Sequence, residues 1–370
     1  MKWVFRILGV GAVLGAAAAA AVYFIPAVQD RLVASQIETA FKIQRDDLVG
    51  DDALRIAICG SGSPMPDPNR RPACNIVMAA GHIFVVDAGP GSWSNVSGWR
   101  LPMNKVEAVL LTHFHSDHIG DLGEVNLQSW VAARPAPLLV YGGPGVERVV
   151  NGFNEAFATD ASHRIAHHGA DYLKPELGTM EARVLANDAG GVLTDGEDIV
   201  VFDRDGLKIT AFSVDHHPIL PAYGYRFDYK GRSVVFTGDT VKDENIARYS
   251  KGADVLISEA MLMQVVEEME RVATQYGRDR FAKILFDIRD YHVAPGDAAD
   301  LAAEACVKHL VFSHVIPPLP QWLGERMFAR DTDRPGLDVH LGYDGMLITL
   351  PADGSAARFE GHALVHLVGD

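Results

Sequence analysis

The residues best suited to chemistry lie in one short segment, residues 112–118, with the sequence Thr-His-Phe-His-Ser-Asp-His. It follows an apolar run, residues 106–111, that is typical of a buried strand. His113 and His115 would point to the same side, because side chains alternate along an extended chain. Asp117 and His118 would face the same space from the loop that follows. Since imidazole and carboxylate groups are ligands of zinc, manganese and iron, the segment predicts a metal site.

Further candidate ligands follow three later segments of strand type. Residues 207–214 lead into Asp215-His216-His217, residues 233–236 into Thr-Gly-Asp239, and residues 310–312 into Ser-His314. Core packing alone does not place histidine or aspartate at the ends of several strands, whereas convergence on a metal does. From the residues alone, His217 is an alternative to its neighbour His216.

Composition limits the classes of partner. The chain has 370 residues, 48% of them hydrophobic, which is enough for a sizeable core. Its formal net charge of −15 argues against a general nucleic-acid-binding protein, because such proteins need a basic face to displace counterions. We therefore expect a small-molecule substrate rather than nucleic acid.

The N-terminal segment predicts a membrane anchor. Residues 7–28 carry no charge, and this run is long enough to form a helix that spans a membrane. Lys2 and Arg6 precede it. The positive-inside rule then places the catalytic body in the periplasm or outside the cell. A cleaved signal peptide is the alternative, because the alanines of residues 16–21 offer a cleavage point. We expect residues 1–30 to form this segment and residues 31–52 a stalk helix.

Residues 53–350 are predicted to form one hydrolase domain, followed by a C-terminal tail, residues 351–370. Closely spaced strands separated by glycine and proline open the domain, which is typical of a β-meander. Strands then alternate with helices, such as the helical pattern of residues 297–306. This order predicts an αββα sandwich of the α/β class, with α+β character. The full fold prediction adds an N-terminal transmembrane helix.

The motif Thr-His-x-His-x-Asp-His resembles the signature of the metallo-β-lactamase fold superfamily. With the downstream Asp-His, Phe-Thr-Gly-Asp-Thr and Ser-His, it resembles the ribonuclease Z and arylsulfatase-like branch over most of residues 54–318. The resemblance implies that one metal ion is held by His113, His115 and His216, a second by Asp117, His118 and His314, and that Asp239 bridges them. It also favours His216 over His217. Asp87, at another strand end, would orient a ligand histidine.

Two further segments resemble the proton-transfer residues of ribonuclease Z. Ser258-Glu259-Ala260 resembles its His-Glu-Ala-Thr segment, with serine in place of the histidine, and Tyr291-His292 lies where it has His-Ser-Thr. The resemblance implies that His292 donates a proton to the leaving group, with Asp117 and Glu259 as the other catalytic residues. Residues 145–178 lack the long glycine-rich and basic arm expected of a tRNA-gripping site.

The expected function is that of an exported, membrane-anchored hydrolase with two divalent metal ions. Zinc is expected, with manganese or iron as alternatives, and the ions would share a hydroxide that attacks the substrate. The expected substrates are phosphodiester or sulfate esters of small molecules. The alternatives are a lactonase or β-lactamase-type hydrolase, a tRNA 3′-processing endoribonuclease, and a non-catalytic metal-binding module.

Several other residues carry expectations of their own. Cys59 and Cys74 are expected to pair in an oxidising compartment, and Cys306 to lie in the core. Residues 261–289 have apolar residues at helical spacing and are expected to form a lid or packing helix. A membrane-facing surface or a homodimer contact is the alternative for that segment. The remaining histidines between residues 159 and 178 are expected to be exposed and not to be ligands; they are His163, His167 and His168.

Overall fold

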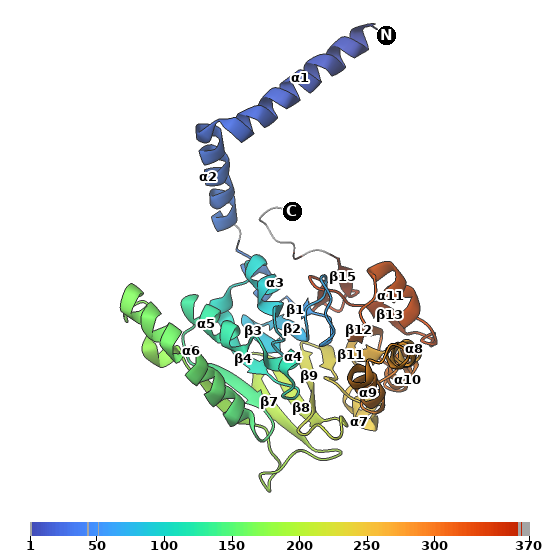
Figure 1. Ribbon diagram of the computed structural model, residues 1–370. Helices are drawn as coiled ribbons and strands as arrows, with labels where there is room; N and C mark the ends of the chain where they lie inside the picture. The colour runs from blue at the N-terminus through green and yellow to red at the C-terminus, as the bar shows by residue number, and fades with distance from the viewer. Residues whose placement is uncertain (1, 43, 51, 362–363, 365–370) are drawn as a thin grey trace. The chain divides into compact units, whose positions relative to one another are not determined.

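The computed structural model describes residues 2–42, 44–50, 52–361 and 364. The chain divides into two units, residues 45–365 and a smaller one of residues 1–44 and 366–370. The described part of the smaller unit is made of two helices, α1 (Lys2–Phe24) and α2 (Pro26–Lys42) (Figure 1). Proline is tolerated at the first position of a helix because its missing N–H would have no helical partner there, so α2 begins at Pro26.

The prediction of one N-terminal transmembrane helix is not supported. Among the described residues, no single helix has both the length and the apolar character needed to span a membrane. Leu14–Phe24 and Pro26–Thr39 have the required length and apolar character only when they are taken together, and the chain bends by 87° between them. Membrane anchoring and a location outside the cytoplasm stay predictions.

The larger unit contains two β-sheets that lie face to face. The eight-stranded sheet runs in the order β15 (Arg358–Glu360), β14 (Leu347–Pro351), β1 (Ala53–Gly60), β2 (Cys74–Ala79), β3 (His82–Val86), β4 (Val106–Leu110), β5 (Leu138–Gly142) and β6 (Met180–Val184). The seven-stranded sheet runs in the order β13 (Asp338–Leu341), β12 (His309–Ile316), β11 (Val255–Met261), β10 (Arg232–Phe236), β9 (Tyr223–Tyr229), β8 (Leu207–Ser213) and β7 (Asp198–Arg204). The opening β1–β2–β3 meander is antiparallel, as predicted, and β3 to β6 are parallel.

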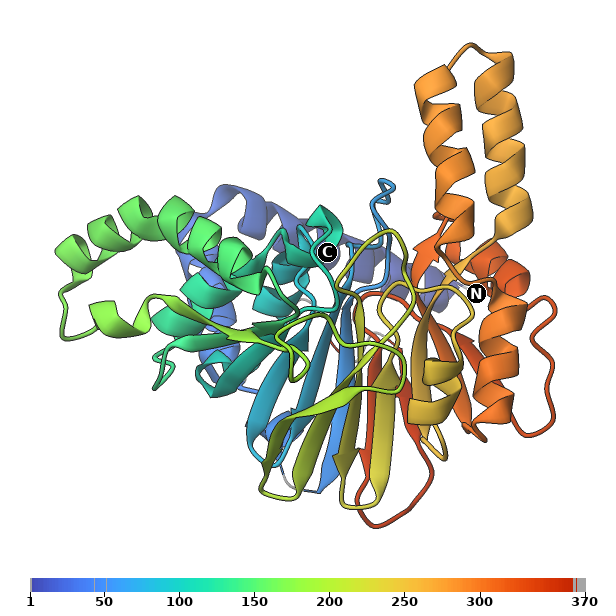
Figure 2. The ribbon, with the colours of Figure 1, turned by 90° about the horizontal axis from the view of Figure 1, so that it is seen from below.

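Helices cover the outer face of each sheet. On the first sheet lie α3 (Ser92–Gly98), α5 (Leu122–Val131) and α6 (Val146–His168), and on the second α7 (Glu244–Tyr249), α10 (Pro295–Glu304) and α11 (Gln321–Phe328) (Figure 2). In β1, Ile56 and Ile58 pack between the sheets while Ala57 packs against the helices. Both faces of the strand are thus buried, which explains its unbroken apolar sequence. The predicted αββα sandwich is confirmed.

Short helices and turns complete the body. They are α4 (Ser116–Ile119) and the 3₁₀ turns η1 (Asp46–Val49), η2 (Met103–Lys105), η3 (Pro175–Leu177) and η4 (Ile288–Asp290). The three histidines between residues 159 and 178 lie on α6 and are exposed, as expected.

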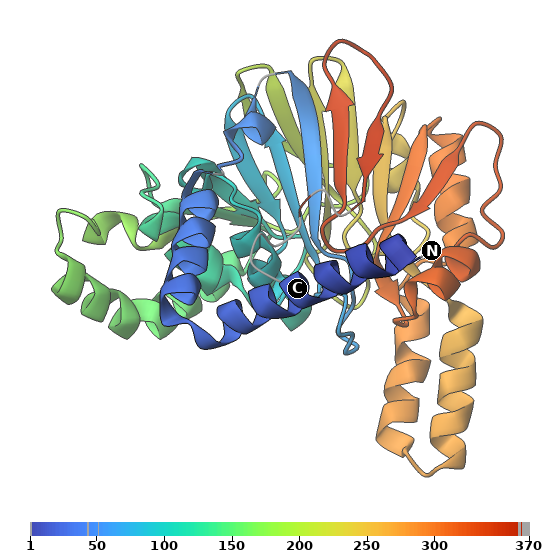
Figure 3. The same cartoon turned by 90° about the horizontal axis from the view of Figure 1, so that it is seen from above.

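The segment of residues 261–289 folds as a helical hairpin. Its helices, α8 (Met263–Gln275) and α9 (Asp279–Asp287), lie side by side and extend away from the sheets (Figures 2 and 3). Gly277, with φ +65°, lies just after the end of α8, where a left-handed residue lets the chain reverse. The prediction of a helical segment is confirmed, although it contains two helices rather than one.

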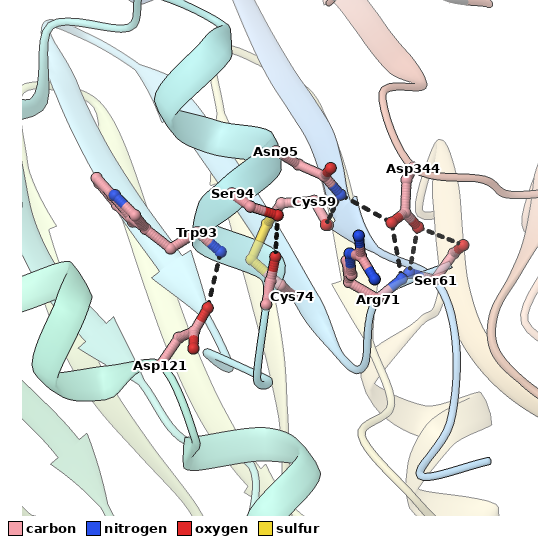
Figure 4. Close-up of a disulfide and its surroundings, with 10 residues drawn as sticks. Cys59, Ser61, Arg71, Cys74, Trp93, Ser94, Asn95, Asp121 and Asp344 are labelled. Atoms are coloured by element: carbon pink, nitrogen blue, oxygen red, sulfur yellow. Dashed lines mark hydrogen bonds between the residues drawn. A yellow bond between two sulfur atoms is a disulfide. The ribbon is translucent and has the colours of Figure 1, made fainter. Parts of the chain in front are cut away.

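A disulfide joins Cys59, near the end of β1, to Cys74, at the start of β2 (Figure 4). The Cα atoms are 5.0 Å apart, so the predicted pairing is confirmed. The expectation for Cys306 is wrong, because this residue is exposed in the turn after α10. Its backbone has φ 55°, a turn conformation that a helical sequence pattern does not reveal.

The loop between β1 and β2 is held by the carboxylate of Asp344, which follows β13 (Figure 4). This carboxylate accepts hydrogen bonds from Ser61 N and Oγ at 2.9 and 2.7 Å, from Arg71 N at 2.8 Å and from Asn95 Nδ2 at 2.8 Å. Burial raises the pKa of Asp344, and these bonds to its charged form oppose that shift. The loop that begins at Ser61 is thereby tied to both sheets.

We predict that the disulfide stabilises the body and that the exposed cysteine does not. Removing the 15-residue cross-link with Cys59→Ala and Cys74→Ala should lower the free energy of unfolding by about 3 kcal/mol, because the unfolded chain regains the entropy of the closed loop. Urea unfolding monitored by circular dichroism measures the change, and Cys306→Ala is the matched control. Three reactive thiols in the denatured, unreduced protein would contradict the pairing.

Candidate metal centre

The candidate ligands gather at one edge of the sandwich because of where the strands end. Asp87 follows β3, the segment of residues 112–118 follows β4, and Asp239 follows β10, while His314 lies near the end of β12. The carboxyl ends of neighbouring parallel strands lie at the same edge of a sheet, so side chains far apart in sequence meet there. His216 joins them from the loop after β8.

Three overlapping groups of side chains place their ligand atoms within 4.8 Å of one another. They are His113, His115, His216 and Asp239; Asp117, His118 and His314; and Asp239, His292 and His314. The first two groups contain the seven residues predicted as ligands. The third shows that His292, predicted as a catalytic acid, also lies within reach of a metal.

Asp239 lies between the first two groups. Its Oδ2 is 3.9 Å from His113 Nε2 and 3.5 Å from His118 Nε2, and its Oδ1 is 3.4 Å from His314 Nδ1. This is the arrangement expected of a bridging carboxylate. The assignment of each residue to one of two ions stays a prediction.

The structure distinguishes the two adjacent histidines after β8. His216 is buried, and its Nδ1 donates a hydrogen bond to the backbone carbonyl of Tyr291 at 2.9 Å. Its Nε2 therefore faces the cluster. His217 is exposed and belongs to none of the candidate groups.

Asp87 orients His118, as expected. Its Oδ2 accepts a hydrogen bond from His118 Nδ1 at 2.8 Å, and its two oxygens accept from Thr112 N at 2.8 Å and Thr112 Oγ1 at 2.9 Å. A carboxylate that holds one ring nitrogen fixes the tautomer and leaves the other nitrogen free for a metal. Thr112 had no role in the sequence-based prediction, although it belongs to the motif.

A bulge aims His314 at the centre. In the pairing of β11 with β12, Ser313 and His314 lie opposite the single residue Glu259. His314 has φ 47°, a left-handed conformation that is uncommon outside glycine. Bulges beside active sites re-aim a side chain in this way, at a local cost in backbone strain.

Among the residues that the structure describes, four buried polar atoms of the predicted ligands have no hydrogen-bond partner. They are His118 Nε2, His216 Nε2, His314 Nδ1 and Asp239 Oδ1. A buried polar atom without a partner costs roughly 1–3 kcal/mol, so four such atoms in one place need an explanation. Divalent cations satisfy all four, and the donor set of imidazoles and carboxylates fits zinc.

Charge and burial act against each other within the cluster. Burial would lower the pKa of His118, but the carboxylates of Asp239 and Asp87 outweigh it and raise that pKa well above its usual value. Burial would raise the pKa of Asp239, and the imidazoles of His314 and His118 bring it well below its usual value. For His216, burial dominates and lowers the pKa to about 4. The centre thus holds deprotonated carboxylates at neutral pH, which is the form that binds metal.

The two other predicted catalytic residues contact each other. Glu259 Oε1 accepts hydrogen bonds from His292 Nδ1 at 2.8 Å and from Thr240 N at 2.9 Å. Burial raises the pKa of Glu259, and the neighbouring His292 opposes that shift. Because Nδ1 of His292 is held, its Nε2 is the nitrogen available for proton transfer. Glu259 is therefore placed to orient the ring of His292.

A cleft of about 430 Å³ opens onto this cluster. Its walls include His115, Asp117, Asp239, His292 and His314. It is also lined by residues 63–66 of the loop held by Asp344, and by Phe281 and Ile284 of α9. The sequence analysis did not predict these apolar residues as part of the site. The helical spacing of Phe281 and Ile284 is visible in the sequence, but the direction in which they point from the helix is not.

Comparisons with known proteins agree with this geometry. Residues 82–315 match the model of the β-lactamase superfamily domain. Ribonuclease Z of Mycobacterium marinum is 35% identical over 294 residues, which are 79% of this chain and 96% of that protein. Ribonuclease Z of Mycolicibacterium gilvum is 34% identical over 296 residues, 79% of this chain and 94% of its own length.

Solved structures show the same fold at lower identity. Human tRNase Z, short form, is 20% identical with a TM-score of 0.56, and the match covers 80% of this chain and 99% of that one. The metallo-β-lactamase fold protein YhfI of Bacillus subtilis is also 20% identical, with a TM-score of 0.54, over 80% of this chain and 100% of its own. The chain therefore belongs to the β-lactamase superfamily, with the metallo-β-lactamase fold and with relatives named ribonuclease Z.

Proposed function

We propose that this metal-dependent hydrolase is a phosphodiesterase of the ribonuclease Z type, with two divalent ions at the cluster. The observation that carries the proposal is the gathering of seven buried or half-buried imidazoles and carboxylates, four of which present an unpartnered atom to one another. Relatives 34–35% identical over nearly their whole length bear the name ribonuclease Z. Sulfate esters, the other substrate class expected from the sequence, have no such support.

His113, His115 and His216 would hold one ion, Asp117, His118 and His314 the other, and Asp239 would contact both. When bound, such a pair of ions activates water and stabilises the charge that develops on a transferring phosphoryl group. The ions are proposed to be zinc, because imidazole nitrogens predominate among the ligand atoms.

The chain's own residues would position the substrate and move the proton. Burial would raise the pKa of Asp117, but the hydrogen bond from His314 and the charges of His118 and His314 together lower it, so Asp117 keeps its charge. His292 lines the cleft with Nε2 available, so it can donate a proton to the departing oxygen. Glu259 holds the ring through a hydrogen bond from its Nδ1.

RNA is a better-supported substrate than the net charge suggests. Relatives named for RNA cleavage weaken the sequence-based expectation against nucleic acid, because a local basic surface is compatible with a net charge of −15. The deciding experiment is 3′ processing of a precursor tRNA by the zinc-loaded chain, compared with a trailer-free tRNA and bis-p-nitrophenyl phosphate. Cleavage at one position 3′ of the acceptor stem supports tRNA processing. Turnover of the small ester alone supports a phosphodiesterase with another substrate, and turnover of none contradicts the proposal.

The adjacent histidines after β8 test the metal centre. His216→Ala should reduce the bound metal from about two ions towards one and abolish turnover, because it removes a buried ligand. His217→Ala should leave both unchanged, since His217 is exposed. Elemental analysis of the dialysed proteins, together with bis-p-nitrophenyl phosphate hydrolysis, measures both effects. Equal losses in the two variants would refute the ligand assignment.

The hydrogen bond by which Asp87 orients His118 can also be tested by substitution. Asp87→Asn should weaken metal binding by about 10- to 100-fold, because an amide holds the imidazole less firmly and does not carry the charge. Competition with a chromophoric chelator measures the affinity. An unchanged affinity would show that Asp87 serves only the turn after β3.

The role of His292 predicts a dependence on the leaving group. His292→Gln should lower kcat about 10²- to 10⁴-fold for an alkoxide leaving group and much less for p-nitrophenolate, which departs without a proton. Glu259→Gln should show the same pattern with a smaller loss, because it acts through His292. Equal losses on both leaving groups would identify His292 as a metal ligand or structural residue instead.

A further inference from the structure

The α8–α9 hairpin has two apolar faces. Ala282 and Leu285 of α9 are buried and belong to the same small core as Val266 and Ala273 of α8. This contact holds the two helices together, with residues spaced three apart along one side of α9. Phe281 and Ile284 of α9 are not members of this core.

Apolar residues beside this core border the catalytic cleft. Phe281 and Ile284 of α9 and Ile288 of η4 follow the spacing i, i+3, i+7 and form one stripe, and all three line the cleft. Ile288 also packs against the small core. Phe281 is 45% exposed and Ile284 55% exposed. Isolated exposed apolar residues are common, but a stripe that faces a catalytic centre indicates a binding surface.

Other residues that line the cleft are apolar as well. Pro64, Met65 and Pro66 come from the loop that Asp344 ties down, and Ile316 comes from the end of β12. None of the described residues that line this cleft is a lysine or an arginine. A second phosphate would find no cationic side chain there, whereas an apolar group would bury the stripe.

We infer that the stripe of Phe281, Ile284 and Ile288, together with Met65, is a subsite for an apolar group attached to the phosphodiester at the metal centre. The inference rests on the proposed function for the phosphodiester part of the ligand. The subsite takes an aryl group, from a simple aryl ester or from a nucleobase, and holds it next to the scissile phosphorus. Ile284 is its specificity-determining residue.

The apolar surface also continues beyond the cleft. Phe281 lines a second groove, of about 520 Å³, on the hairpin itself, with Val265, Met269, Val272 and Tyr276. Glu268 and Arg278 line this groove as well, so it is a separate hollow on the hairpin that shares Phe281 with the cleft.

Binding tests the subsite without requiring turnover. The zinc-loaded full chain should bind phenylphosphonate at least about tenfold more tightly than methylphosphonate by calorimetry, because a few buried methylene equivalents discriminate by about 10- to 200-fold. Ile284→Ser should reduce this preference about tenfold, and Ile284→Leu should keep it. Phe286→Ser is the matched control, since Phe286 is 54% exposed on the same helix and does not line the cleft.

Turnover separates the inference from the proposed function. Phenyl and methyl p-nitrophenyl phosphate share a leaving group, so the ratio of their kcat/KM values should fall about tenfold in Ile284→Ser and not in Phe286→Ser. Hydrolysis of both esters with a ratio unaffected by Ile284→Ser would overturn the subsite and leave the function standing. Preference for phenylphosphonate without hydrolysis of either ester would support the subsite and contradict the proposed function.

A third ester identifies the source of the aryl group. Thymidine 5′-(p-nitrophenyl phosphate) carries a nucleobase in place of the phenyl ring. A comparable loss of its kcat/KM in Ile284→Ser shows that the subsite accepts a nucleobase. A loss confined to the phenyl ester shows that it takes simple aryl groups.

Discussion

The buried charge of Asp239 is the constraint on which the centre depends. A carboxylate with 3% of its surface exposed is costly to ionise unless cations or hydrogen-bond donors face it. Its neighbours are His113, His118 and His314, which come from both sheets. The Asp239 carboxylate therefore stays ionised only while the two sheets keep their positions relative to each other. The apolar core between the sheets, which makes up much of the protein's interior, thereby fixes the distances within the centre.

The partners of the site histidines follow from the same constraint. Three of the imidazoles that face Asp239 or the cleft have one ring nitrogen held, each by a different partner. Asp87 holds His118, the Tyr291 carbonyl holds His216, and Glu259 holds His292. Two of these partners lie more than 30 residues from the histidine they hold, and one lies 75 residues away. Such partners are positioned by the tertiary fold and not by local sequence.

This difference explains how much could be predicted from the sequence. The gathering of the candidate ligands was predictable because His113, His115, Asp117 and His118 form a local motif, and because strand ends are visible as apolar runs. The αββα sandwich and the Cys59–Cys74 pair were predictable for similar reasons. The choice of His216 rested on the resemblance alone, since the residues themselves left His217 open until the contact with Tyr291 was known. The exposed turn at Cys306 and the direction of the α9 stripe depend on backbone conformation and packing, which composition does not reveal.

Two observations about the site indicate different kinds of substrate. Relatives named ribonuclease Z indicate a polyanionic chain, whereas a wall of isoleucine, phenylalanine and methionine without cations indicates an apolar group. The two are compatible if the centre itself supplies the positive charge for one phosphodiester and the wall binds what is attached to it. A polymer would then have to be held outside the cleft, because the residues Phe281, Ile284 and Ile288 that line this part of the cleft are apolar. Under this arrangement α9 selects the group beside the phosphorus, while the two sheets determine the chemistry.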